Sequence, residues 1–340
     1  MKQWTAIDLF GGCGGLTAGL KRAGFRVISS VEFDPLAAAT YSANHPKVTV
    51  LPKNIRNVPS TAFLTKGVDS VDLVAGCPPC QGFSRVRRRN RPRARRDDRN
   101  SLILEYQRVV EDLQPRAVFM ENVPGIELDY RFKRFVSRLV ELGYAVNWDL
   151  VQLANHGVPQ RRNRVVLLAG KGFNISLPRA SRNQRTVRQA IESLPLPRES
   201  RNRLHNLVTC HDKGILERIR AVPRNGGSRS AWAENLRLQC HTDCDGFKDV
   251  YGRMAWDEPA PTITGGCINA SKGRFLHPRQ NRVITLFEAA LLQTFPRRYH
   301  FDLSKGRYAV AEMIGNALPP RFAERVGLSI IAAFTKDCHG

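Results

Sequence analysis

The sequence has few acidic residues for its length. Its 30 Asp and Glu stand against 53 Lys and Arg, so the 340 residues carry a formal net charge of +23. A balance this basic indicates a polyanionic partner, and the predominance of Arg over Lys favours contacts with phosphates and base edges. The alternative is a basic surface that is only solvated.

Long apolar runs are lacking as well. No stretch approaches the roughly 20 apolar residues that cross a membrane. The chain starts with Met1-Lys2-Gln3-Trp4 and enters a predicted strand, without the charged and apolar regions of a secretion signal. The 8 cysteines are scattered and form no disulfide framework. We therefore expect a cytoplasmic protein with reduced thiols and no membrane partner.

A complete set of metal ligands is missing too. Cys77 and Cys80 form a Cys-x-x-Cys pair, but no second pair exists to complete a tetrahedral site. The other candidate ligands match no standard zinc-finger spacing. These are Cys210, His211, Cys240, His241 and Cys244. We expect no metal.

Short apolar runs alternate with helix-length amphipathic stretches over the first half of the chain. This alternation is typical of an α/β fold with a doubly wound sheet. The predicted strands are 5–10, 26–31, 71–75 and 117–121, and the predicted helices are 16–23, 35–44, 101–113 and 132–142.

The pattern changes after Tyr144. Two strand-like runs, 146–153 and 164–169, flank a polar turn and predict a hairpin that closes the sheet. Over 173–277 the periodicity weakens, as in an irregular recognition module, and helices are predicted again at 285–293 and 321–334. We predict a first domain over 1–172, a smaller irregular domain over 173–300, and a C-terminal segment over 301–340 that returns to the first domain.

Cys80 is the most informative single residue. It follows an apolar strand and a Pro78-Pro79 pair, which fixes the backbone that approaches the thiol. This context favours a nucleophile over a buried structural cysteine or a redox pair with Cys77, which remain alternatives.

Arginines crowd the segment just after this thiol. Like charges and a shortage of apolar residues argue against independent folding, so we expect a loop ordered by phosphates, with a solvated tether as the alternative. The cluster comprises Arg87, Arg88, Arg89, Arg91, Arg93, Arg95 and Arg96.

A glycine-rich turn joins the first predicted strand to the first helix, over residues 8–16. Glycines let the backbone approach a ligand, and the helix offers its N-terminal NH groups. Thr17 stands where a dinucleotide motif has its third glycine, so the turn indicates a nucleoside cofactor of another kind. Glu32, after the second strand, is placed to accept bonds from ribose hydroxyls or is a simple surface carboxylate.

Three further positions suggest chemistry. Glu121 ends an apolar strand and could donate or share a proton with a ring nitrogen, or only cap a loop. Arg162 and Arg164 lead into the hairpin strand, where alternation would put both guanidinium groups on one face to hold an anion or a base edge. Gly315-Asn316-Ala317-Leu318-Pro319-Pro320 is predicted as a turn between helices, with Asn316 capping a helix or touching a ligand.

With these residues in place, the chain resembles the DNA cytosine-5 methyltransferases over nearly its full length. The ordered set of motifs carries the resemblance, because each motif alone is weak. In this sequence they are Phe10-Gly11-Gly12-Cys13-Gly14, Pro79-Cys80-Gln81, Glu121-Asn122-Val123, the Gln160, Arg162 and Arg164 set, 282–296, and Gly315-Asn316.

The resemblance implies an S-adenosylmethionine-dependent methyltransferase fold of Rossmann-like type. It makes 1–172 the catalytic and cofactor-binding domain and 173–300 the target-recognition domain. The implied catalytic residues are Cys80, Glu121, Arg162 and Arg164. The implied S-adenosyl-L-methionine ligands are Phe10, Gly12, Gly14, Leu16, Glu32, Phe33, Asn54, Ile55, Pro79 and Asn316. The implied DNA contacts are Gln81, Ser84, Arg85, Arg87, Arg88, Arg89, Arg224 and Arg229.

The family's chemistry supplies the expected activity. Cys80 would add to C6 of a flipped-out cytosine, and a methyl group would pass to C5. The implied partner is double-stranded DNA, so we expect a nucleoid-associated monomer, either in a restriction-modification system or solitary. A companion endonuclease is not visible in this sequence.

Some positions depart from the family pattern. Asn54 replaces an expected Asp, and Phe287 and Leu291 replace expected arginines. Two alternatives therefore stay open. One is a tRNA cytosine-5 methyltransferase, although the Cys-Phe-Thr signature of that branch is missing. The other is a non-catalytic DNA-binding protein on the same scaffold.

Overall fold

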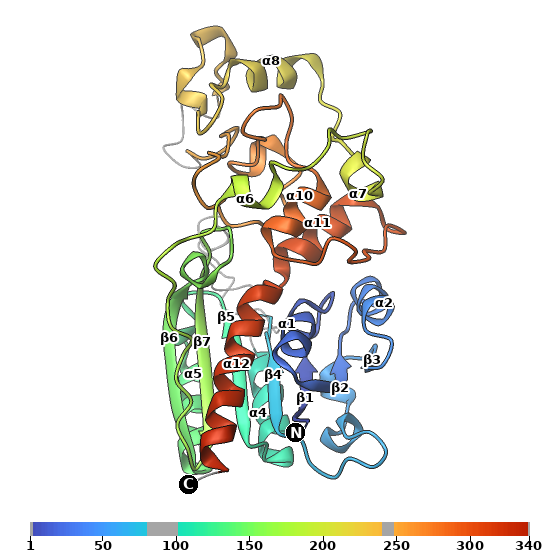
Figure 1. Cartoon of the computed structure of the whole chain (residues 1–340), viewed down its shortest axis with the longest axis vertical. Coiled ribbons are helices and arrows are strands. Elements are labelled where there is room, and N and C mark those ends of the chain that lie inside the picture. The colour runs from blue at the N-terminus through green and yellow to red at the C-terminus, as the bar shows by residue number, and fades with distance from the viewer. Residues whose placement is uncertain (1–2, 80–100, 240–247, 339–340) are drawn as a thin grey trace. The chain divides into compact units, whose positions relative to one another are not determined.

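The computed structural model describes residues 3–79, 101–239 and 248–338 (Figure 1). The chain divides into two compact units. The first comprises Met1–His156, Asn163–Ala180 and Leu318–Gly340, and the second comprises Gly157–Arg162 and Ser181–Ala317. The sequence prediction put the two main borders at residues 172 and 300, whereas these units divide at 180 and 317.

A seven-stranded sheet forms the described framework of the first unit, in the order β3-β2-β1-β4-β5-β7-β6. The first five strands are parallel, and β7 runs antiparallel to both β5 and β6. The predicted doubly wound fold and its closing hairpin are confirmed. The strands are β1 Thr5–Leu9, β2 Arg26–Val31, β3 Thr49–Leu51, β4 Leu73–Gly76, β5 Ala117–Asn122, β6 Tyr144–Gln152 and β7 Asn163–Lys171.

Burial explains why these segments are strands. Every residue of β1, β4 and β5 is buried, as expected for central strands covered on both faces. The sequence prediction missed β3, since three residues are too short to show periodicity.

Helices cover both faces of the sheet. Alternation along β1 directs Ile7 and Leu9 into one core with α4 and α5, whereas Asp8 meets Thr17 of α1, which packs against α12. The helices are α1 Gly15–Ala23, α2 Pro35–Asn44, α4 Leu102–Leu113, α5 Tyr130–Glu141 and α12 Pro320–Asp337.

The second unit is irregular, as predicted, but holds more helix than its weak periodicity indicated. Its α-helices in the described residues are α6 Val187–Ile191, α7 Arg203–Asn206, α8 Lys213–Ala221, α10 Leu286–Leu292 and α11 Gly306–Asn316. The predicted turn between helices over 315–320 is present but shorter, because α11, which packs against α10, continues through Asn316 and α12 begins at Pro320.

A buried ion pair fixes the start of α10. Both guanidinium Nη atoms of Arg282 lie 2.7 Å from the carboxylate oxygens of Glu288, and Thr285 caps the helix with the same Glu288 in a capping box. At the two departures from the family pattern, Phe287 is buried against the ring of His205, and Leu291 is half-buried. An apolar side chain thus occupies the space next to His205.

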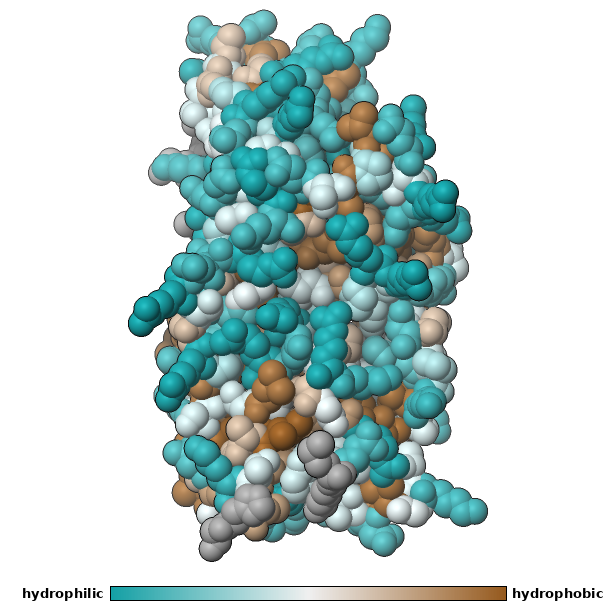
Figure 2. All heavy atoms as spheres, viewed as in Figure 1, coloured by the Kyte–Doolittle hydropathy of each residue, from teal (hydrophilic) through white to brown (hydrophobic). Residues whose placement is uncertain are grey.

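Surface features match the composition. Figure 2 shows hydrophilic side chains over most of the face in view, which agrees with a composition that is 24% charged residues. Within the described residues, no helix is long and apolar enough to cross a membrane.

Candidate active site

The carboxyl ends of the parallel strands bring the predicted site residues of the first unit to one edge of the sheet. In the strand register, Leu9 pairs with Val31 on one side and Gly76 on the other, and Gly76 pairs with Met120. The residues that follow these positions therefore lie side by side. They are Phe10, Glu32, Cys77 and Glu121.

The glycine-rich turn has the backbone geometry that its sequence predicts. Phe10, Gly12 and Gly14 have φ values of 62°, 54° and 89°, in the left-handed region that favours glycine. A side chain on Gly11 would come within 2.2 Å of Ser30 Oγ, whereas one on Gly12 would meet no atom within 4 Å. The turn is thus packed beneath Gly11 and open at Gly12.

Glu32 braces this turn. Its carboxylate accepts hydrogen bonds from the backbone NH groups of Gly12 and Asp34, both at 2.8 Å. Burial raises the pKa of Glu32, and these two hydrogen bonds oppose the rise. A carboxylate can accept about four hydrogen bonds, so it retains capacity for ribose hydroxyls.

The other predicted cofactor residues of the first unit fit a nucleoside. The ring of Phe33 is 71% exposed directly after Glu32, which leaves an aromatic face open for stacking. Asn54 caps the short helix η1, Ile55–Asn57, by accepting the NH of Arg56. Ile55 and Leu16 are buried, and Pro79 is half-buried. An open glycine turn, an acidic residue and an exposed ring together fit S-adenosylmethionine.

Asn316 belongs to the second unit. It is the exposed last residue of α11. Its predicted contact with the cofactor stays a prediction.

Asp8 was not in the predicted site, although it lies beneath the glycine turn. The carboxyl is fully buried and accepts a 2.7 Å hydrogen bond from Thr17 Oγ1, which also contacts the Tyr41 hydroxyl at 2.5 Å. Burial raises the pKa of Asp8 to about 7. An acidic residue inside the apolar strand Thr5–Leu9 was the signal that could have identified it.

Asn122 anchors the strand end that leads to Cys80. Its side-chain amide donates to the carbonyl of Pro78 at 3.0 Å, and its own side-chain oxygen accepts the NH of Val123. Cys80 and the predicted DNA contacts that follow it lie outside the described residues. Those contacts are Gln81, Ser84, Arg85, Arg87, Arg88 and Arg89.

The neighbouring Cys77 is a thiol in an unfavourable place for a thiolate. Burial raises its pKa well above the usual range, and the charge of Glu121 adds to the rise. Because the thiolate is the reactive form of cysteine, Cys77 is poorly suited to act as a nucleophile.

Glu121 and Arg164 form an ion pair between adjacent strands. Arg164 Nε lies 2.7 Å from Glu121 Oε1, and the two side chains are only 13% and 8% exposed. Burial lowers the pKa of Arg164, and the charge of Glu121 opposes this shift. A carboxylate can accept about four hydrogen bonds, so Glu121 retains capacity to accept one from a ligand beside its ion pair with Arg164.

Whether Arg162 shares a face with Arg164 stays a prediction, because Arg162 directly precedes strand β7, which begins at Asn163. Arg162 belongs to the second unit, where its Nη1 donates to the carbonyls of Ile263 and Gly315 at 3.1 Å. Gln160 lies in the same unit and bonds to Gln293 and the carbonyl of Leu292.

The segment from Arg224 to Arg229 is held in a defined shape. Asn225 and Gly226 have φ values of 55° and 98°. The side-chain oxygen of Asn225 accepts the NH of Trp256 at 2.8 Å. Arg274 Nη1 donates to the carbonyls of Gly226 and Gly227. Arg224 is exposed and Arg229 is half-buried.

Arg253 was not predicted, although its backbone NH donates to the carbonyl of Gly227 in this segment at 2.9 Å. Its guanidinium is fully buried and donates to five acceptors. Burial lowers the pKa of Arg253 to about 10, and the charge of Arg224 adds to the lowering. The acceptors are the carbonyls of Ile219, Val222, His277 and Gln280 and the side-chain oxygen of Asn281.

Metal ligands do not gather in the described part of the chain, where no group of three or more His, Cys, Asp or Glu could hold an ion. Cys210 is exposed. Cys240, His241 and Cys244 lie outside the described residues.

Comparison with known proteins agrees with this geometry. The model of the C-5 cytosine-specific DNA methylases matches residues 4–332. The type II methylase M.HgiDII of Herpetosiphon aurantiacus is 35% identical over 353 residues, covering 95% of this chain and 94% of that protein. The type II methyltransferase M1.HphI of Haemophilus parahaemolyticus is 35% identical over 343 residues, covering 98% and 88%.

Solved structures show the same fold. The Entamoeba histolytica methyltransferase EhMeth superposes with a TM-score of 0.70 at 16% identity, covering 98% of this chain and 99% of that one. The family match and the curated relatives define a methyltransferase that uses S-adenosylmethionine as its methyl donor. The chain belongs to the family of C-5 cytosine-specific DNA methylases. The resemblance derived from the motifs is confirmed.

Proposed function

We propose that this chain methylates C5 of a flipped-out cytosine within a specific sequence of double-stranded DNA, with Cys80 as the nucleophile. The observation that carries the proposal is the end of β5. There, Asn122 holds the carbonyl of Pro78, two residues before Cys80, and the adjacent Glu121 is paired with Arg164. The segment that leads to Cys80 and the residue Glu121 thus follow paired positions of the neighbouring strands β4 and β5, which supports the proposal.

Cys80 supplies covalent catalysis. C5 of cytosine is a poor nucleophile, and addition of the Cys80 thiolate to C6 makes it enamine-like. S-adenosylmethionine, when bound, supplies an electrophilic methyl group to that carbon. Loss of the C5 proton then lets the C6–sulfur bond break, which restores the ring and frees Cys80.

Glu121 is proposed to bind N3 and the exocyclic amine of the base as charge develops there. Its burial makes this interaction strong, since fewer water molecules screen it. Arg164 holds the carboxylate in place, so its role is positioning and charge compensation. Arg162 is proposed to hold the base or to support Cys80, and its two carbonyl contacts fix its guanidinium for either task.

DNA recognition is assigned to the second unit and to the arginine-rich segment. C6 is hidden in stacked DNA, so the base must leave the duplex before Cys80 can reach it. Arg224 and Arg229 are proposed to contact base edges or phosphates. Since the curated relatives named above are type II enzymes, we propose sequence-specific modification by a monomer, either beside a cognate endonuclease or alone.

Transfer of labelled methyl groups tests the proposal. The protein is incubated with labelled S-adenosylmethionine and either duplex DNA or tRNA, and wild type is compared with Cys80→Ser. We expect label on C5 of cytosine in duplex DNA only, and none with the variant. Label on tRNA instead would change the substrate, label on neither would favour a non-catalytic DNA-binding protein, and equal transfer by Cys80→Ser would remove Cys80 from the mechanism.

A further inference from the structure

Arg108 of α4 makes several hydrogen bonds to the turn that starts with Asn54-Ile55. Its Nη2 donates to the carbonyls of Ile55 and Val58, each at 3.1 Å, and its Nη1 donates to Ser60 Oγ at 2.8 Å. Its Nε bonds to Glu105 at 2.9 Å, within the same helix. One guanidinium thus ties α4 to three successive points of the turn.

The turn is held from its other side as well. The carbonyl of Phe63, in the short helix η2 (Ser60–Phe63), accepts a 2.6 Å hydrogen bond from Ser29 of β2. Ser60 also donates to Asp112 of α4 at 2.6 Å. Residues 54–63 are therefore held by hydrogen bonds to both β2 and α4. Arg108 provides most of the side-chain hydrogen bonds that come from the helix.

We propose that Arg108 is a positioning residue for the S-adenosylmethionine site. This inference rests on the proposed assignment of Asn54 and Ile55 to the cofactor. Arg108 sits behind these residues and acts through the backbone that presents them. The planar fork of a guanidinium serves three acceptors at once, which a lysine ammonium on a flexible stem does not match.

Because Asn54 stands where Asp was expected, the position in which Arg108 holds the turn matters more for cofactor binding. An amide carries no charge, so it attracts a polar group of the nucleoside less strongly than the carboxylate expected there. The side-chain oxygen of Asn54 is also engaged by the NH of Arg56. The affinity of Asn54 and Ile55 for S-adenosylmethionine then depends on the position in which Arg108 holds the turn.

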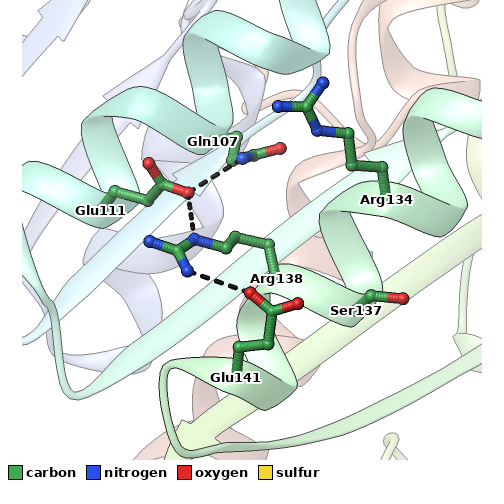
Figure 3. Close-up of a pocket in the computed structure, with 6 residues that line it drawn as sticks. All are labelled: Gln107, Glu111, Arg134, Ser137, Arg138 and Glu141. Atoms are coloured by element: carbon green, nitrogen blue, oxygen red, sulfur yellow. Dashed lines mark hydrogen bonds and ion pairs between the residues drawn. The ribbon is translucent and has the colours of Figure 1, made fainter.

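Arg138 of α5 offers a matched control. Figure 3 shows its guanidinium beside the carboxylates of Glu111 and Glu141, in a surface hollow of about 380 Å³ between α4 and α5. The ion pairs measure 2.7 and 3.0 Å. Arg138→Met therefore removes the same charge from the same pair of helices without removing a bond to residues 54–63.

Calorimetric titration with S-adenosylhomocysteine tests the proposal. We expect Arg108→Met to raise the Kd about tenfold, which is about 1.4 kcal/mol, Arg108→Lys to raise it less, and Arg138→Met to leave it within about twofold. In steady-state assays, KM for S-adenosylmethionine should rise in Arg108→Met, while kcat at saturation and KM for DNA should stay within about twofold. A purely structural role would instead lower Tm and the active fraction.

Each result has one meaning. A wild-type Kd in both Arg108 variants overturns the positioning role, as does an equal rise in Arg138→Met. Failure of the wild type itself to bind the ligand or transfer methyl groups would instead refute the proposed function. If Arg108→Met does not fold, Arg108→Lys decides, because it keeps the charge and most of the packing.

Discussion

The side-chain amide of Asn122 donates a hydrogen bond of 3.0 Å to the carbonyl of Pro78. Asn122 ends β5, whereas Pro78 lies two residues beyond the end of the neighbouring parallel strand β4 and two positions before Cys80. A bond at this point fixes the backbone from which the proposed nucleophile departs. It also ties Pro78 to the strand end that carries Glu121, because Asn122 directly follows Glu121.

Asn122→Ala should therefore slow the chemical step. The lost bond frees the Pro78 carbonyl, and a displacement of about 1 Å at a reacting group can lower a rate about 100-fold. Single-turnover methyl transfer to duplex DNA measures the effect, and calorimetry should show that S-adenosylhomocysteine binds as in the wild type. A variant with the wild-type rate would remove Asn122 from the positioning of Cys80.

Replacement of each thiol should separate the two cysteines. Because burial and the charge of Glu121 raise the pKa of Cys77, its thiol is poorly suited to act as the nucleophile, and Cys77→Ala should keep the methylation rate within about threefold. Cys80→Ser should abolish transfer, since a hydroxyl is a much weaker nucleophile at neutral pH. The decisive measurement is trapping on duplex DNA that carries 5-fluorocytosine at the target. Cys77→Ala should form the covalent adduct and Cys80→Ser should not.

The ion pair between Glu121 and Arg164 should matter for stability as well as for catalysis. Arg164→Met leaves a buried carboxylate without its cation, and we expect a loss of about 3 kcal/mol in the free energy of unfolding. Glu121→Gln combined with Arg164→Met should recover much of that stability, because no charge stays buried. The double variant should remain inactive if Glu121 binds the base. Urea unfolding and methyl transfer, measured on both variants, test the two statements separately.

Sequence patterns predicted those parts of the site whose positions follow directly from where the strands end. The carboxyl ends of parallel strands meet at one edge, so Phe10, Glu32 and Glu121 could be placed together from predicted strands alone. The bounds of the strands were predicted less well, since β7 begins at Asn163 and ends at Lys171, whereas the predicted run covers 164–169. Sequence patterns do not mark where a strand starts to within one residue.

Contacts between distant segments were beyond the same patterns. Asn122 meets Pro78 across 44 residues, and Arg108 meets Ile55 across 53 residues. Arg253 collects acceptors from 24 to 34 residues away. Tertiary packing determines the hydrogen-bond partners of a buried polar side chain, and the residues next to it in the sequence do not identify them.

The buried carboxyl of Asp8 should make stability depend on pH. Burial raises its pKa from 3.8 to about 7, the hydrogen bond from Thr17 opposes the rise, and the charge of Glu32 adds to it. Between these two pKa values the folded protein keeps a proton that the unfolded chain has released. This group's contribution is therefore fully present below about pH 4 and is lost as the pH rises to about 7.

Asp8→Asn isolates that contribution. The amide does not titrate, so the variant should gain stability relative to the wild type as the pH rises from about 5 to about 8. Urea unfolding of both proteins across this range measures the difference, and other titrating groups cancel in the comparison. A difference that stays constant with pH would contradict a raised pKa at Asp8.

The segment from Arg224 to Arg229 should lose sequence discrimination when its support is removed. Arg274 Nη1 donates to the carbonyls of Gly226, Gly227 and Arg253 at 2.9 to 3.0 Å. Arg274→Met releases these carbonyls and lets the segment move, while Arg224 and Arg229 keep their charges. Base-edge contacts need fixed geometry, so we expect the ratio of kcat/KM on the target to that on a site with one changed base pair to fall about tenfold. Phosphate contacts tolerate movement better, and total affinity for duplex DNA should change less.

Arg321→Met is the control, because it removes one positive charge at an exposed ion pair with Glu324 in the first unit. It should weaken DNA binding slightly and leave the ratio unchanged. Methylome sequencing first identifies the target sequence. The two protein variants are then compared on that target and on sites with one changed base pair. All measurements use one salt concentration, since affinity for DNA depends strongly on salt. An unchanged ratio in Arg274→Met would mean that the chain reads its target elsewhere, because the Arg224 to Arg229 segment would have lost its support without affecting recognition.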